Sequence, residues 1–168
     1  MPEKDGVDME LEPPKEKQPL KIYLDVCCLN RPFDDWAQER IRLEGDSIVS
    51  IMERIRIGQW QLIESEAIAA ELEKMSNLEK KERILELLEL ATVVQKIDDN
   101  IDLRGQQLER LGFGLYDAFH LACAEAACAD VFLSTDDRLL KNALRYRDTL
   151  KVEVYNPVVW LITVLQSE

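Results

Sequence analysis

The sequence has a single histidine, His120, and it lacks the spaced cysteine pairs of zinc fingers and ribbons. Its four cysteines are the adjacent Cys27 and Cys28 and, in an alanine-rich stretch, Cys123 and Cys128. Neither arrangement matches a zinc module, and one histidine cannot supply a set of nitrogen ligands. We therefore expect four reduced cysteines that pack as small buried side chains, with a metal or redox role as the alternative.

Long apolar runs are also missing. No stretch approaches the roughly 18 to 20 apolar residues of a membrane helix, and the N-terminus has no apolar signal region. Basic residues are scarce as well, because 21 Lys and Arg stand against 33 Asp and Glu, a net charge of -12. This excess of acidic residues argues against non-specific nucleic-acid binding over the whole surface, but it is compatible with a local basic groove or an acidic metal site. We expect a cytoplasmic protein with no membrane association.

The 168 residues are enough for one domain with a substantial core. Residues 1–20, rich in acid and proline, are predicted to be a disordered tail, and residues 21–168 the folded domain. Strands are predicted to alternate with helices, which is typical of a parallel sheet covered on both faces. The strands are expected at 21–25, 60–63, 91–95, 131–134 and 152–154, and the helices at about 35–57, 66–74, 78–90, 98–111, 115–129, 136–146 and from 157.

Several carboxylates follow the predicted strands. Asp25 comes directly after the first strand, Glu71 lies on the apolar side of the helix after the second, and Asp117 opens an alanine-rich helix. Asp136 and Asp137 follow the strand at 131–134. Because right-handed crossovers bring every strand-to-helix loop to one edge of a parallel sheet, we expect these acids to converge.

Each acid also has a structural interpretation. Asp136 is placed to cap a helix, and Asp117 to stabilise a helix N-terminus. Glu71, and Glu44 on the inward face of the first long helix, could instead pair with buried arginines. Asp25 is expected to have no helix to cap, because it directly ends a buried strand, so it is the strongest candidate for chemistry.

Carboxylates packed together repel one another unless cations neutralise them, and Mg²⁺ and Mn²⁺ prefer such all-oxygen ligands. One or two of these ions can align a phosphodiester, activate water and stabilise the leaving oxygen. His120 lies one helical turn from Asp117 and is expected to pack in the helix or to support a ligand from behind. The acids therefore predict a metal site suited to phosphodiester chemistry.

Four segments resemble, in order, those of the PIN-domain ribonucleases, most of all the toxin-type members of the VapC kind. They are IYLD at 22–25, SEAIAAEL at 65–72, YDAFHLACA at 116–124 and VFLSTDD at 131–137. The resemblance covers roughly residues 21–160. It implies a three-layer α/β/α sandwich with a central, mainly parallel sheet. It further implies metal-dependent cleavage of an RNA substrate, an antitoxin protein as partner and often a homodimer.

Carried over by position, the resemblance implies that Asp25, Glu71, Asp117 and Asp137 are the catalytic acids and bind Mg²⁺ or Mn²⁺. Asp137 matches the family's Thr-x-Asp pattern, and Asp136 is kept as its alternative. The hydroxyl of Thr135 would lie close to the site, where it could contact substrate. The match departs from the family directly after Asp25, where Val26, Cys27 and Cys28 stand in place of a small polar residue, and in the unusual loop NRPFDD at 30–35.

Basic residues near these acids are candidates for binding phosphate. Arg31 follows the first acid, and Arg138 and Lys141 share a predicted helix face after the last one, which could equally be a solvated surface. Trp36 and Phe33 could stack on a base or pack the loop onto the body of the protein.

Two rivals to the ribonuclease hypothesis remain. A catalytically weak PIN-like module that binds RNA or protein is favoured by the acidic charge and the altered loop. A phosphatase of the haloacid dehalogenase type would need Asp-x-Asp after the first strand, where the sequence has Asp25-Val26-Cys27, and it ranks low.

Overall fold

The computed structural model describes residues 18–168, and the predicted disorder of the tail lies mostly outside them. Five parallel strands form one sheet in the order β3-β2-β1-β4-β5. The strands are β1 (Leu20–Leu24), β2 (Trp60–Ser65), β3 (Val93–Gln95), β4 (Val131–Leu133) and β5 (Val154–Tyr155). Leu20, assigned to the tail from sequence, is thus the first residue of the central strand.

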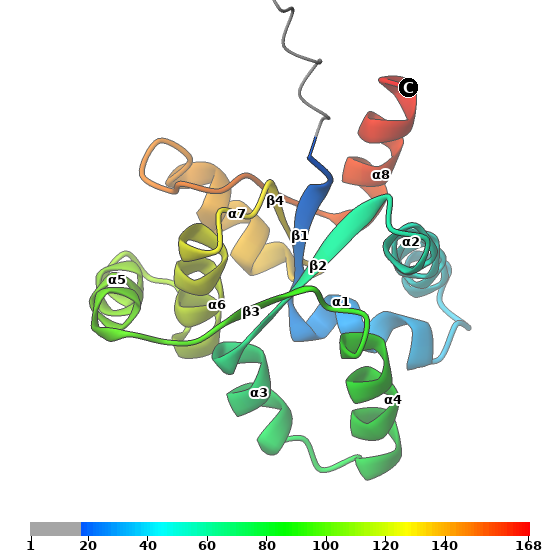
Figure 1. Cartoon of the computed structure of the whole chain (residues 1–168), viewed down its shortest axis with the longest axis horizontal. Helices are drawn as coiled ribbons and strands as arrows, with labels where there is room; N and C mark the ends of the chain where they lie inside the picture. The colour runs from blue at the N-terminus through cyan, green and yellow to red at the C-terminus, as the bar shows by residue number, and fades with distance from the viewer. Residues whose placement is uncertain (1–17) are drawn as a thin grey trace, which may run out of the picture.

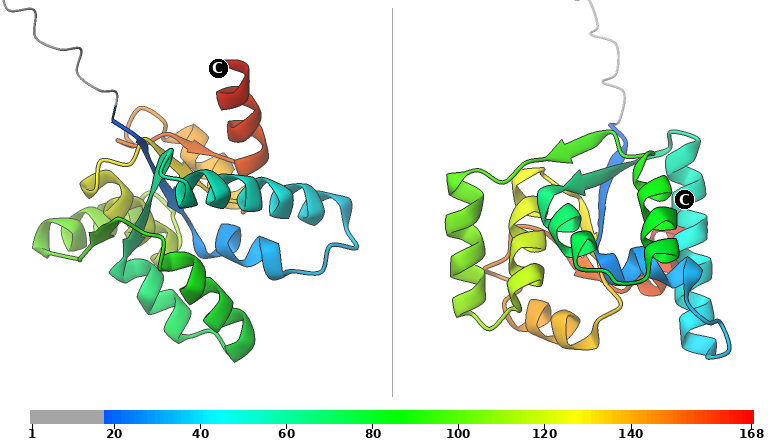
Figure 2. Two further views of the ribbon diagram at one scale, coloured as in Figure 1. Left: turned by 45° about the vertical axis from the view of Figure 1, so that its right-hand side comes forward. Right: turned by 90° about the horizontal axis from the view of Figure 1, so that it is seen from below.

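Helices cover both faces of the sheet, as expected for a three-layer α/β/α sandwich (Figure 1). The helices are α1 (Val26–Asn30), the 3₁₀ turn η1 (Arg31–Phe33), α2 (Glu39–Arg56), α3 (Glu66–Glu73), α4 (Leu78–Leu88), α5 (Asp99–Arg110), α6 (Leu115–Ala126), α7 (Asp137–Arg145) and α8 (Pro157–Gln166). In Figure 1, α5, α6 and α7 lie on one side of the sheet, and α2 and α8 on the other. Figure 2 shows α5 beside α6, and α3 and α4 close to α1.

The core is built around β1, whose neighbours in the sheet are β2 and β4. Ile22, Tyr23 and Leu24 are completely buried, as a strand flanked on both edges and both faces must be. The ring of Tyr23 stacks on Phe132 of β4 with centroids 5.1 Å apart. All three central strands end at the same edge of the sheet, so the residues that follow them lie near one another.

Side-chain caps begin several helices where the sequence predicted them. Ser65 accepts a hydrogen bond from the amide of Ile68 at the start of α3, and Asn156 accepts one from Val158 at the start of α8. Asp136 caps α7, in line with its structural interpretation. These caps satisfy backbone donors that would otherwise lack partners at the helix ends.

The segment after β1 differs from the expectation of a loop. Residues 26–30 form α1 and residues 31–33 form η1, and α2 begins only at Glu39. Neither Asp34 nor Asp35 caps α2, whose N-cap is Gln38. The turn residues Asn30 and Pro32 therefore mark the junction between two short helices, because proline fits the first turn of a helix.

The cysteine prediction holds in part. Cys28 and Cys123 are buried, Cys27 is half-buried and Cys128 is exposed, and all four are free thiols. Cys128, which follows the C-cap Ala127 of α6, has a positive φ of 55°, in the position where a helix often ends in the left-handed region. In the part of the chain from residue 18 onward, no helix combines the length and apolar character needed to cross a membrane.

Candidate functional site

Asp25 lies at the buried end of β1, where its side chain is only 2 % exposed. Contrary to the expectation from sequence, it does cap a helix, because its Oδ1 accepts a hydrogen bond from the amide of Cys28 at 2.9 Å. Burial raises the pKa of Asp25, while the neighbouring Ser134 and the Cys28 amide act in the opposite direction. One carboxylate oxygen thus caps α1, and ionisation of the buried carboxyl group costs free energy.

The pKa of Asp117, in the first turn of α6, is affected by the other acids at this edge of the sheet. Burial, together with repulsion by Asp25, Asp136 and Glu71, raises the pKa of Asp117 to about 6, while His120 acts in the opposite direction. The same four carboxylates all raise the pKa of the Cys27 thiol, after burial as the main cause. This edge of the sheet therefore has acids that come from the end of β1, from α3, from α6 and from the start of α7.

Glu71 is held by a relay of buried polar groups. Its Oε2 lies 2.9 Å from Nε2 of His120, whose Nδ1 lies 2.7 Å from the hydroxyl of Tyr23. The Tyr23 hydroxyl in turn lies 2.6 Å from Oγ of Ser65. If Ser65 donates to Tyr23 and Tyr23 to Nδ1, neutral His120 donates through Nε2–H to Glu71, and each group in the relay is satisfied. His120 thus supports a candidate ligand from behind, one of its two expected roles.

Asp136 and Asp137 occupy different surroundings. Asp136 lines a cavity of about 190 Å³ together with Asp117 and Arg138. Asp137 is exposed and accepts two hydrogen bonds from Arg40, at 2.8 Å from Nη1 and 2.7 Å from Nη2, and this ion pair lowers its pKa. Of the two adjacent acids, Asp136 is therefore the one that faces the other carboxylates.

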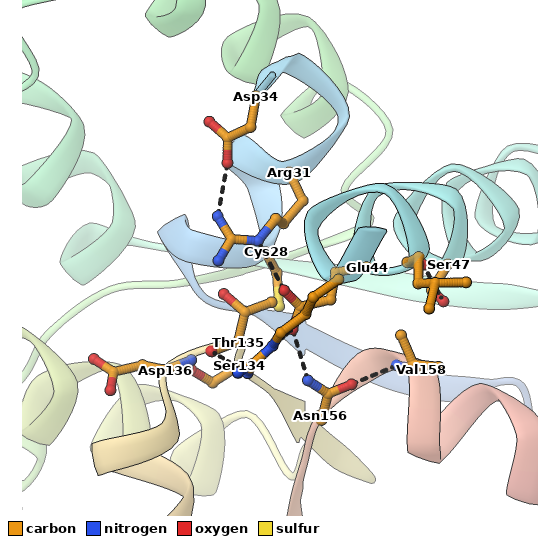
Figure 3. A network of polar contacts seen from close by, with 12 residues as sticks. Cys28, Arg31, Asp34, Glu44, Ser47, Ser134, Thr135, Asp136, Asn156 and Val158 are labelled. Carbon is orange, nitrogen blue, oxygen red and sulfur yellow. Dashed lines mark hydrogen bonds and ion pairs between the residues drawn. The ribbon is translucent and has the colours of Figure 1, made fainter. Parts of the chain in front are cut away.

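The predicted phosphate-binding residues are only partly available. Arg31 lies between Asp34 and Glu44, and Asn156 donates to the other oxygen of Glu44 at 2.8 Å (Figure 3). Glu44 is buried and is thus an ion-pair partner, as its structural interpretation proposed. In contrast, Arg138 and Lys141 are exposed on α7.

Thr135 lies two residues after the end of β4, and its buried Oγ1 has no hydrogen-bond partner among the described residues. A buried hydroxyl without a partner is costly, so its position beside the acids suits it to a ligand. Arg40, which was not predicted from the sequence as a site residue, donates through Nη2 to the carbonyl oxygen of Thr135 at 3.3 Å. Its location in the first turn of α2, 95 residues before Thr135, gave no local signal in the sequence.

The two aromatic candidates pack onto the protein. The indole of Trp36 lies against Gly45, where an added Cβ would come within 2.7 Å of Nε1, and Nε1 donates to the carbonyl of Arg31. Phe33 packs at the edge of the core beneath the guanidinium of Arg83. Both rings therefore hold the segment after β1 in place, as the packing interpretation predicted.

The chemistry of the acidic edge suits Mg²⁺ or Mn²⁺, because Asp25, Glu71, Asp117 and Asp136 offer only oxygen donors. As placed, no three His, Cys, Asp or Glu side chains between residues 18 and 168 form a complete metal-binding group. Binding of an ion would require these carboxylates to move within coordination distance of one point. A cation would also remove the repulsion that raises the pKa of Asp117.

The raised pKa of Asp117 predicts a pH-dependent stability difference. Folding raises this pKa from 3.8 to about 6, so the folded protein binds more protons and loses stability as the pH rises through this range. Asp117→Asn removes the buried charge, and we expect it to raise the Tm at pH 7.5 by roughly 3 to 6 °C, after discounting for the hydrated part of the group. At about pH 3.5 the gain should vanish, because the acid is then protonated in both states.

Thermal unfolding followed by circular dichroism at both pH values, without divalent ions, measures this difference. Asp148→Asn, at an exposed position, is the matched control and should change the Tm little at either pH. A loss of stability in Asp117→Asn that is equal at both pH values would show that the carboxylate is not destabilised by its surroundings.

Solved structures share this fold. The structure of FitAcB from Neisseria gonorrhoeae matches with a TM-score of 0.51 and 20% identity, over 81% of this chain and 97% of the other. VapBC2 from Rickettsia felis, bound to a DNA fragment from their promoter, matches with a TM-score of 0.51 and 15% identity, over 82% and 98%. No match was found among curated proteins. The family model for the PIN domain covers residues 22–144, and the chain therefore belongs to the PIN domain family.

Proposed function

We propose that the protein is a ribonuclease that depends on Mg²⁺ or Mn²⁺, with Asp25, Glu71, Asp117 and Asp136 as the metal-binding acids. The observation that carries the proposal is the placement of these four acids, from four segments of the chain, at one edge of the sheet, where Asp117 and Asp136 line one cavity and Asp25, Asp136 and Glu71 are near enough to raise the pKa of Asp117. PIN domains are generally nucleases and generally use divalent metals, which supports this assignment.

The chain's own groups have distinct tasks in this proposal. A divalent ion held by the acids would supply an activated water and neutralise charge on the phosphate. His120 fixes the orientation of Glu71 through its Nε2–H. Arg138, on the cavity that Asp117 and Asp136 line, and Lys141 one helical turn later would bind the RNA backbone. Thr135 would offer its unpartnered hydroxyl to substrate or to metal-bound water.

A toxin of a toxin–antitoxin pair is the role that we propose for this nuclease, acting in the cytoplasm. The resemblance to VapC-type toxins supports it, and the shared fold with FitAcB and VapBC2 agrees with it. An antitoxin protein and a second copy of the chain would then be its protein partners. A weakly catalytic module that binds RNA or protein is the second candidate, because the carboxylates do not form a complete metal group as placed and the net charge is -12.

Metal binding and cleavage can be tested on the same preparation. We expect Mn²⁺ at about a hundred times its dissociation constant to raise the Tm by roughly 5 to 10 °C, because binding to the folded state alone raises the free energy of unfolding by about 2.7 kcal/mol. A labelled single-stranded RNA should be cut with Mn²⁺ or Mg²⁺ and left intact with EDTA. The Tm increase should persist in Asp148→Asn and disappear in Asp117→Asn. RNA binding without cleavage under any divalent ion would instead favour the weakly catalytic module.

A further inference from the structure

We propose that Arg40 binds an RNA phosphate beside the acidic edge, and that Asp137 occupies this guanidinium when RNA is absent. The inference rests on the proposed function, because it assigns part of the RNA-binding surface of the same site. It gives Asp137 a role as a competing anion in place of the metal-binding role that the Thr-x-Asp pattern implied.

The geometry of the pair is that of an arginine bound to an oxyanion. Nη1 and Nη2 of Arg40 donate to the two oxygens of Asp137 at 2.8 and 2.7 Å, a fork that fits two oxygens on one centre. A phosphodiester presents two such oxygens with a full negative charge. The Asp137 carboxylate therefore occupies the place where a phosphate would bind.

The guanidinium of Arg40 is held by protein contacts on one side and is exposed to solvent on the other. Nη2 donates to the carbonyl oxygen of Thr135 at 3.3 Å, and Nε lies 3.5 Å from the buried Glu44. These contacts hold the guanidinium at the exit of β4, while its side chain remains 55 % exposed. A positioned cation of this kind can bind an anion without reorganising the protein.

The partner that Arg40 would release lies at the surface. Asp137 is 69 % exposed, so its ion pair with Arg40 is open to screening by salt and to competition from an anion in solution. The other arginine of this region, Arg31, is less free, since it is only 23 % exposed and is bound by Asp34 and Glu44 together. Asp34 is also paired with Lys80. Exchange of a carboxylate for phosphate is therefore easier at Arg40 than at Arg31.

Arg40 lies next to the acids, where a positively charged side chain would offset their repulsion of an RNA phosphate. Thr135, which Arg40 contacts, directly precedes Asp136, and Asp136 shares a cavity with Asp117. A phosphate held by Arg40 would lie beside this acidic edge, in a protein whose net charge of -12 repels RNA. Lys141, whose charge also acts on Asp137, would add to the positive field at the same point.

RNA binding by the full chain tests the exchange directly. Fluorescence anisotropy with a labelled single-stranded RNA, in EDTA and in an Asp25→Asn background that prevents cleavage, gives the Kd. We expect Asp137→Asn to tighten binding by about threefold to tenfold, because it removes the competing charge and keeps the shape. Arg40→Gln should weaken binding by about tenfold, and Arg40→Lys by less.

Matched controls are available on the same elements. Arg56→Gln removes an arginine whose exposed partner is Glu53 at the other end of α2, and Asp148→Asn removes an exposed acid after α7. In the double variant of Arg40→Gln with Asp137→Asn, the gain from Asp137→Asn should be lost, because the two residues act on one another. Binding that is unchanged or weaker in Asp137→Asn, or a loss in Arg40→Gln no larger than in Arg56→Gln, would overturn the inference.

Cleavage assays separate this inference from the proposed function. In the cleaving protein, Asp137→Asn should lower KM with kcat within about twofold of the original, whereas loss of a metal ligand would remove kcat. If no divalent ion supports cleavage but Asp137→Asn still tightens RNA binding, the nuclease proposal fails and the exchange at Arg40 stands. Loss of kcat in Asp137→Asn with no gain in RNA affinity would restore Asp137 to the metal site.

Discussion

Asp25→Asn is expected to reduce RNA cleavage by at least about a hundredfold while the protein stays folded. The amide keeps an oxygen that can accept the hydrogen bond from Cys28, so the cap of α1 survives. It removes the negative charge that a divalent ion needs, and such an ion contributes several kcal/mol of transition-state stabilisation. Because burial raises the pKa of Asp25, loss of its charge should not destabilise the fold.

Initial rates on a labelled RNA with saturating Mn²⁺ measure this effect, and the Tm without metal reports the integrity of the fold. Asp148→Asn carries the same change of charge at an exposed position and should cleave normally. Cleavage that continues at the original rate in both Asp25→Asn and Asp117→Asn would exclude the acidic edge as the catalytic site.

Glu44→Ala is expected to lower the free energy of unfolding by about 2 to 4 kcal/mol. Glu44 is buried on α2, where it accepts hydrogen bonds from Arg31 at 3.1 Å and from Asn156 at 2.8 Å. Removing the carboxylate leaves the amide of Asn156 and the guanidinium of Arg31 without their shared partner. The contact of α2 with the start of α8 and with the segment after β1 would then weaken (Figure 3).

Urea unfolding should place the midpoint of Glu44→Ala about 1 to 2 M below that of the original protein. Glu53→Ala removes a carboxylate from an exposed ion pair on the same helix and is expected to change the midpoint little. Glu44→Gln keeps the volume of the side chain, and its midpoint should lie between those of Glu44→Ala and Glu53→Ala. Equal midpoints for Glu44→Ala and Glu53→Ala would show that the buried network does not stabilise the fold.

The alternation of strands and helices made the fold accessible from sequence. Parallel strands buried on both faces read as short apolar runs, and residues such as Ser65 and Asn156 signal helix starts through local hydrogen bonds. The placement of Asp25, Glu71 and Asp117 near one another could also be predicted, since right-handed crossover connections place the ends of parallel strands at one edge of the sheet. These features depend on local pattern and on general topology.

Other features of the site depend on contacts that no local pattern encodes. Two adjacent acids follow β4, and only the start of α7 at Asp137, with Asp136 as its cap, decides which of them faces Asp117. Arg40 reaches Asp137 across 97 residues of sequence, so its importance emerged from the folded chain alone. The short helix α1 was missed because its N-cap, Asp25, was interpreted through its place at the end of a strand.

The central place of β1 has a consequence for the order in which the chain can fold during synthesis. β1 pairs with β4, and the backbone amide of Lys21 binds Asp130 across a separation of 109 residues. Such non-local pairing is slow, because a long loop must close before the contact forms. A growing chain on the ribosome cannot complete its central sheet until β4 has emerged. Asp117 and Asp136 arrive late as well, so an unfinished chain lacks half of the proposed acids and, under the proposed function, would not yet cleave RNA.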